Sequence, residues 1–127
     1  MPRTRKDEAP VAVDHPVVEG RYVELDDYTV SFETFHVDAD AAPMFRGLPD
    51  DRCQCPHWGV VLTGAMTVRY ADGEETFTAG DAYYLRPGHE PEVTAGTEVV
   101  EFSPTAELHK TQEVLGANMA AAAGAAQ

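Results

Sequence analysis

Turn residues recur at short, regular intervals in the second half of the chain, and this spacing limits the folds open to it. Between residues 52 and 102 the chain consists of short segments rich in Val, Thr, Tyr and Phe. Each segment ends at a turn signal: Gly64, Asp72-Gly73, Gly80-Asp81, Pro87-Gly88 and Ala95-Gly96. An Asp-Gly pair between two such segments is a strong hairpin signal. Short strands separated in this way indicate an antiparallel sandwich or barrel.

The remaining segments complete one expected domain. Residues 28–37 alternate between apolar and polar side chains, which is typical of a half-buried strand. Ser103 and Pro104 suit the cap and first position of a helix, which we expect to run for about three turns and to end at Gly116. The expected organisation is a flexible N-terminal arm (1–16), a β-barrel (17–103), and a C-terminal helix with an alanine-rich tail (104–127).

Charge and cysteine content narrow the range of partners and compartments. The chain has 22 acidic and 9 basic residues, for a net charge of -13. Nucleic-acid sites need clustered Lys and Arg, and anionic membranes repel an acidic surface, so we expect neither partner. No apolar run approaches the roughly 18 residues of a membrane span, and no long apolar stretch follows the N-terminus. With only two cysteines, both expected to be reduced, a cytoplasmic location is predicted.

The most informative segment for chemistry is the one around the two cysteines. In a single strand Asp51, Cys53, Cys55 and His57 would share one face, and His89 follows a Pro-Gly turn elsewhere in the barrel. Two thiolates and two imidazoles match zinc or another soft-to-borderline divalent ion. We therefore predict a metal site of Cys53, Cys55, His57 and His89. Zinc is the expected ion, with iron, copper or nickel as alternatives, and participation of Asp51 is left open.

Two other interpretations of these residues stay open at this point. The cysteines can be small buried hydrophobes, with His57 a hydrogen-bonded core residue. A cysteine nucleophile with His57 or His89 as its base is the third option. The acidic residues Asp50 and Asp51 disfavour it, because reactive thiols usually occupy electropositive surroundings.

Two segments resemble the motifs of the cupin superfamily. Residues 57–64 resemble the end of its first motif, and residues 80–89, from Gly80 through Pro87-Gly88 to His89, resemble its second. The resemblance covers roughly residues 45–102. It implies an all-β, cupin-type jelly-roll barrel, here followed by a short C-terminal helix. It also implies oxygenase, isomerase or lyase chemistry on a small organic molecule, without a way to choose among them.

The ligand positions depart from the family pattern. Counted back from Gly64, His57 takes the position of the family's glutamate, and the two preceding histidine positions fall at Asp51 and Cys53. Counted forward from Gly47, Cys53-x-Cys55 replaces the family's His-x-His. The last histidine position falls near Pro91, and His89 has the same strand parity. The family's iron oxygenase chemistry therefore does not transfer directly to this chain.

Two functions and one assembly state follow as expectations. The first function is a small metalloenzyme acting on a small molecule inside the barrel, its catalytic residues unassigned. The second is a non-catalytic module that binds or senses a small ligand, with a structural metal or none. Trp58, Val60 and Leu62 should face away from the barrel interior. Because exposed apolar strips are often covered by a partner, we expect a homodimer.

Overall fold

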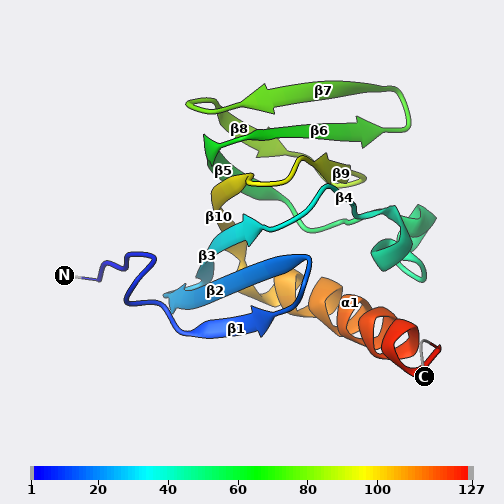
Figure 1. The fold of residues 1–127 in the computed structure, drawn as a ribbon, viewed down its shortest axis with the longest axis horizontal. Helices are drawn as coiled ribbons and strands as arrows, with labels where there is room; N and C mark the ends of the chain where they lie inside the picture. Colours follow the sequence, from blue (N-terminus) through cyan, green and yellow to red (C-terminus); the bar gives the residue numbers. More distant parts are fainter. Residues whose placement is uncertain (1, 126–127) are drawn as a thin grey trace.

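The protein folds into two antiparallel sheets and one long helix (Figure 1). The computed structural model describes residues 2–125. Its elements in chain order are β1 (Val11–Asp14), β2 (Val18–Leu25), β3 (Tyr28–Phe35), β4 (Ala39–Asp40), the 3-10 turns η1 (Ala42–Phe45) and η2 (Pro49–Asp51), β5 (His57–Thr63), β6 (Ala65–Tyr70), β7 (Gly73–Thr78), β8 (Ala82–Leu85), β9 (Glu90–Val93), β10 (Glu98–Pro104) and α1 (Thr105–Ala125).

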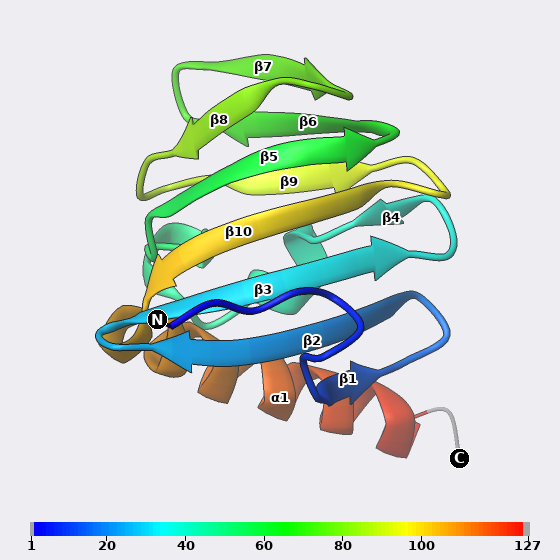
Figure 2. The same ribbon diagram turned by 90° about the vertical axis from the view of Figure 1, so that its left-hand side faces the viewer.

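The two sheets pack face to face as a jelly roll. The six-stranded sheet has the order β1-β2-β3-β10-β5-β8, and the four-stranded sheet has the order β4-β9-β6-β7. Figure 2 looks onto the outer face of the six-stranded sheet, with the second sheet behind it and α1 along one end. A cluster of buried side chains fills the space between the sheets: Val61, Met66, Val68, Tyr70, Tyr83, Leu85, Val93 and Val99. The antiparallel architecture predicted from the turn spacing and the all-β jelly roll implied by the motif resemblance are therefore confirmed.

Strand alternation decides which side chains reach the interior. On β5, Val61 is fully buried, whereas Trp58 and Leu62 are exposed, as the sequence pattern predicts. On β3 the alternation has the opposite sense from the usual one. The polar residues Thr29 and Ser31 point inward and are buried, so the part of the interior wall that β3 forms is polar.

The N-terminal segment is more ordered than the arm expected over residues 1–16. Val11–Asp14 forms strand β1, which pairs with β2 at the edge of the large sheet. The Arg21 guanidinium also donates hydrogen bonds to the carbonyl oxygens of Lys6 and Ala9, at 3.4 Å each. Ala9 is buried as a result. These contacts come from β2, so the local sequence of the segment did not reveal them.

The C-terminal helix differs from the prediction at both ends. Ser103 is not a helix cap, because β10 continues to Pro104 and α1 begins at Thr105. The helix also passes through Gly116 and reaches Ala125, while residues 126–127 of the expected tail lie outside the described residues. The Asn118 amide donates to the carbonyl oxygens of Met44 and Arg46 at 2.6 and 2.9 Å, which anchors the helix beyond Gly116. Across the described residues, no helix combines the length and apolar character that crossing a membrane requires.

Candidate metal centre

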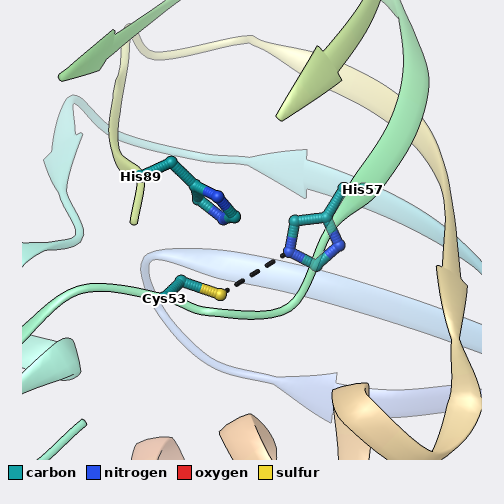
Figure 3. A group of neighbouring side chains, drawn as sticks. All are labelled: Cys53, His57 and His89. Carbon is teal, nitrogen blue, oxygen red and sulfur yellow. Dashed lines mark hydrogen bonds between the residues drawn. The ribbon is translucent and has the colours of Figure 1, made fainter. Parts of the chain in front are cut away.

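Three side chains converge in the interior, near the end of the barrel that α1 covers. Cys53, His57 and His89 each offer one ligand atom, and these atoms all lie within 4.8 Å of one another. Figure 3 shows the Cys53 thiol and both imidazoles turned toward a common centre. The Cys53 Sγ atom lies 3.7 Å from His57 Nε2, and the two imidazole centroids are 5.0 Å apart. Only 2%, 8% and 1% of Cys53, His57 and His89 are exposed.

Backbone pairing brings two of these residues together across the fold. Cys53 and His89 form an isolated antiparallel bridge. The Cys53 amide donates to the His89 carbonyl oxygen at 3.1 Å, and the Gly88 amide donates to the Cys53 carbonyl oxygen at 2.8 Å. Gly88 has a φ of 94°, a conformation that glycine adopts without strain. The Pro87-Gly88 turn therefore delivers His89 beside Cys53, while His57 arrives as the first residue of β5.

The strand that was expected to align Asp51, Cys53, Cys55 and His57 does not form before His57. Residues 49–51 make the 3-10 turn η2, and Pro56 lacks the amide hydrogen that a longer β5 would need for pairing. Asp51 is exposed, and its carboxylate accepts a hydrogen bond from the Gly47 amide at 3.0 Å. Asp51 is therefore not part of the cluster.

Cys55 also lies outside the three-residue cluster. Its Sγ atom donates to the carbonyl oxygen of Pro56 at 3.5 Å. Its side chain is buried among the apolar side chains of Phe45, Leu48 and Leu108, which join η1 and α1 to this loop. Of the four predicted ligands, the structure brings together Cys53, His57 and His89, and Cys55 lies outside this group in an apolar cluster to which Cys53 also belongs.

Both imidazole rings are oriented by a hydrogen bond at Nδ1. His89 Nδ1 lies 2.8 Å from the Arg86 carbonyl oxygen, which can only accept a hydrogen bond. His89 Nδ1 therefore carries the proton, and Nε2 keeps the lone pair that a metal needs. His57 Nδ1 lies 2.6 Å from Ser103 Oγ. Burial lowers the pKa of both His57 and His89 to about 4, so both rings are neutral at pH 7.

The Cys53 thiol is protonated at neutral pH when no metal is bound. Burial raises its pKa to about 11, although hydrogen bonding with the Cys55 backbone and the Thr111 side chain opposes this. Nucleophilic cysteines are partly exposed and have lowered pKa values. The surroundings of Cys53 are the reverse, which argues against the cysteine-nucleophile interpretation. Metal binding would displace the thiol proton.

A pair of interior carboxyl groups was not identified from the sequence. Glu101 accepts a hydrogen bond from the Tyr83 hydroxyl at 2.7 Å, and Glu33 accepts one from the Tyr22 hydroxyl at 3.3 Å. Burial raises the pKa of Glu33 to about 8 and that of Glu101 to about 7. Glu33 and Glu101 occupy inward-facing positions of β3 and β10, respectively. The alternation of residues 28–37 places Glu33 on the same face as Thr29 and Ser31, but it does not tell which face is the inner one.

A groove lies beside the barrel interior and is not lined by Cys53, His57 or His89. A cavity of about 500 Å³ runs between β2, β3 and α1 and is lined by Pro10, Tyr22, Val23, Glu24, Thr29, His109 and Gln112. Its wall includes Tyr22, whose hydroxyl contacts Glu33. Tyr22 therefore lies between the groove and the Glu33 carboxyl group.

Comparisons with known proteins identify the class of fold. No family model matches the sequence, and no curated protein sequence is significantly similar to it. Two-sheet jelly rolls among solved structures match closely in shape. They include an RmlC-like cupin from Shewanella frigidimarina, with 14% identity over 80% of this chain and 88% of that one and a TM-score of 0.55. The chain accordingly has the cupin fold, as the motif resemblance implied.

Two further solved structures support the same conclusion. KdgF from Halomonas sp. is 19% identical over 79% of this chain and 90% of its own, with a TM-score of 0.56. The polyketide cyclase RemF from Streptomyces resistomycificus is 15% identical over 83% of this chain and 80% of its own, with a TM-score of 0.57. At this level of identity the similarity establishes the fold and leaves the activity to be argued from the site.

Proposed function

We propose that the protein is a small metal-dependent cupin-fold protein in which Cys53, His57 and His89 bind one divalent transition ion, with zinc the expected metal. The observation that supports this most directly is the distance between Cys53 Sγ and His57 Nε2, 3.7 Å. Zn–S and Zn–N bonds of about 2.3 and 2.0–2.1 Å at a tetrahedral angle place the two ligand atoms about 3.6 Å apart. Cys53 and His57 therefore need little movement to share a zinc ion, and the three ligand atoms all lie within 4.8 Å of one another.

The number of ligands favours an exchangeable position at the metal. Structural zinc sites use four protein ligands, whereas catalytic sites use three and keep the fourth position for water or substrate. The proposed site has three. A zinc ion there would supply Lewis-acid chemistry to a small organic molecule. The proposed activity is therefore that of a small metalloenzyme, with the reaction type and substrate unassigned.

A second candidate function is supported by the burial of the site. The Thr111 side chain of α1 contacts Cys53, and His89 is almost completely enclosed. A closed centre of this kind suits a non-catalytic cupin that binds or senses a small ligand and uses its metal structurally. The two candidates differ in the fourth ligand, which X-ray absorption at the zinc edge identifies. A light oxygen ligand that exchanges for azide in the cobalt-substituted protein supports the enzyme, and a fourth protein ligand supports the module.

The metal proposal is tested with a matched pair of cysteine variants. Protein purified without a metal-affinity tag is analysed for metal content and then titrated with Zn²⁺ after chelation. We expect one ion per chain in the wild type. Cys53→Ser should weaken binding by more than about a hundredfold, since even the loss of partners behind the ligands costs 10–100-fold. Cys55→Ser alters a thiol two residues away, in the apolar cluster, and should retain the ion.

The outcomes of this pair separate the possibilities. Equal loss of zinc in both variants would return Cys55 to the ligand set. Stoichiometric zinc in Cys53→Ser, or no binding by the wild type, would overturn the metal site and leave the cysteines as core residues.

We also propose an oligomeric state and a cellular location for the protein. The outer face of the six-stranded sheet, which Figure 2 looks onto, includes strands β5, β8 and β10. On these strands Trp58, Leu62, Tyr84 and Phe102 are exposed, and the Trp58 and Tyr84 rings stack with centroids 5.0 Å apart. We propose that a second copy covers this apolar face, because such patches on soluble proteins are usually buried by a partner. A thiolate ligand also requires a reduced Cys53, which fits a cytoplasmic location. Nucleic acid is not a proposed partner of a chain with a net charge of -13.

A further inference from the structure

The hydrogen bond to His57 Nδ1 comes from the inner wall of the barrel. Phe102 of β10 pairs with Trp58 of the antiparallel strand β5. The next residue of β10, Ser103, therefore lies beside the preceding residue of β5, His57. The Ser103 Oγ atom is 2.6 Å from His57 Nδ1, and Ser103 is only 1% exposed. The Ser103 hydroxyl therefore contacts the Nδ1 side of the His57 ring, while Cys53 lies on the Nε2 side.

A serine hydroxyl can either donate or accept, so two arrangements satisfy this contact. In the first, Nδ1–H donates to Ser103 Oγ, and Nε2 keeps its lone pair toward Cys53. In the second, the serine hydroxyl donates to Nδ1, and Nε2–H points at the Cys53 sulfur 3.7 Å away. Only the first arrangement leaves His57 ready to bind a metal through Nε2.

A neighbouring carboxyl group favours the first arrangement. Glu101 Oε2 lies 3.8 Å from His57 Nδ1, and the Tyr83 hydroxyl holds the other oxygen of the same carboxyl at 2.7 Å. A carboxyl oxygen carries negative partial charge and therefore attracts a proton placed on Nδ1. Tyr83 can reach Glu101 because Gly59 has no side chain. A Cβ at that position would lie 2.6 Å from the tyrosine oxygen.

We infer that Ser103, with Glu101 behind it, is a positioning residue that holds His57 as the Nδ1–H tautomer and so presents Nε2 to the metal. The inference deepens the proposed function and rests on it for its effect on metal affinity. The part of the inference that concerns the His57 tautomer applies to the metal-free protein and does not depend on metal binding. Partners of this kind, which fix the ring orientation of a ligating histidine, typically change metal affinity by about 10–100-fold.

The experiment reads the tautomer and the affinity separately. Long-range ¹H–¹⁵N correlation spectra of the metal-free protein report which nitrogen of His57 carries hydrogen. Zn²⁺ titration against a competing chelator reports affinity. The variants are Ser103→Ala, which removes the hydroxyl, and Ser103→Thr, which keeps it. The control is Ser31→Ala, because Ser31 is an inward-facing serine of the same sheet, is 4% exposed, and is not a hydrogen-bond partner of His57, whose ring nitrogens contact Cys53 and Ser103.

The expected pattern is specific. Wild type, Ser103→Thr and Ser31→Ala should show a protonated Nδ1, whereas Ser103→Ala should shift the proton toward Nε2 and weaken zinc about 10–100-fold. A metal-free wild type with hydrogen on Nε2 would overturn the inference. So would zinc affinity in Ser103→Ala within about twofold of wild type. Failure of the wild type to bind zinc would instead overturn the proposed function, and the tautomer spectra would still decide the role of Ser103.

Discussion

Cys53 and His57 place Sγ and Nε2 within 3.7 Å of each other, although the two residues belong to different local structures. His57 starts the regular strand β5, while Cys53 sits in a loop and is tied by an isolated bridge to His89. The distance suits coordination of one ion by both residues. The three residues between them form a loop, and this loop holds Cys55 away from the proposed ion. The proposed centre thus depends on a loop geometry and not on a continuous strand.

Metal affinity should fall as pH falls. Burial raises the pKa of Cys53 to about 11 and lowers those of His57 and His89 to about 4, so between these values binding displaces one proton, that of the thiol. The apparent zinc affinity should therefore decrease about tenfold for each pH unit from 8 to 6. Chelator competition at pH 6, 7 and 8 measures this slope. An affinity independent of pH over this range would contradict a thiolate ligand.

Glu33→Gln should stabilise the metal-free protein increasingly as pH rises. The pKa of this carboxyl is about 8 in the folded protein, against an ordinary value of 4.5, because burial disfavours its ionised form. Between these values the unfolded chain releases a proton that the folded chain keeps, so stability drops as pH rises, by about 1.4 kcal/mol per unit at most. Urea unfolding at pH 5 and pH 8 should show a much larger gain for Glu33→Gln at pH 8. Equal effects at both pH values would show that the carboxyl is solvated.

Gly116→Ala should stabilise the protein by about 0.5–1 kcal/mol, because Gly116 lies inside α1 and alanine favours the helix. Apart from the neighbouring residues and backbone of α1 itself, no atom of the described residues lies within 4 Å of a Cβ added there. Thermal unfolding followed by circular dichroism measures the effect. A loss of stability would indicate that the helix ends at this glycine, as its sequence alone suggested.

Gly59→Ala is the opposite case and should destabilise the protein by about 2 kcal/mol or more. A Cβ at this position would lie 2.5 Å from the Val100 carbonyl oxygen and 2.6 Å from the Tyr83 ring. The same unfolding measurement applies, with Gly116→Ala as the matched glycine control. Unchanged stability would mean that Tyr83 does not pack over Gly59.

Trp58→Glu should convert the proposed dimer to a monomer, because it places a charge at the centre of the apolar outer face. Val37→Glu is the control, since Val37 is equally exposed but lies outside the strands of that face. Sedimentation velocity at micromolar concentration distinguishes the two states. A wild type that sediments only as a 13.8 kDa species would refute the dimer.

Local sequence patterns determined the strands, their turns and the antiparallel all-β class, and the motif resemblance added the jelly roll. The Asp72-Gly73 hairpin forms, and Trp58 and Val61 take the outer and inner sides of β5 as their alternation predicts. These features depend on turn chemistry and on the two-residue period of a strand, both of which are readable over a few residues. The sequence also singled out His57 and His89 as the histidines able to share a site.

The tertiary structure alone decided the make-up of that site and the polarity of the interior. Cys53 joins the histidines because a backbone bridge links it to His89, and Cys55 turns into the apolar cluster beside α1. Ser103 reads locally as a helix cap, yet pairing of β10 with β5 makes it the partner of His57. Each of these outcomes depends on contacts between segments far apart in the chain. Local periodicity does not encode such contacts, because it gives the spacing of side chains along a strand but not which face the rest of the protein will cover.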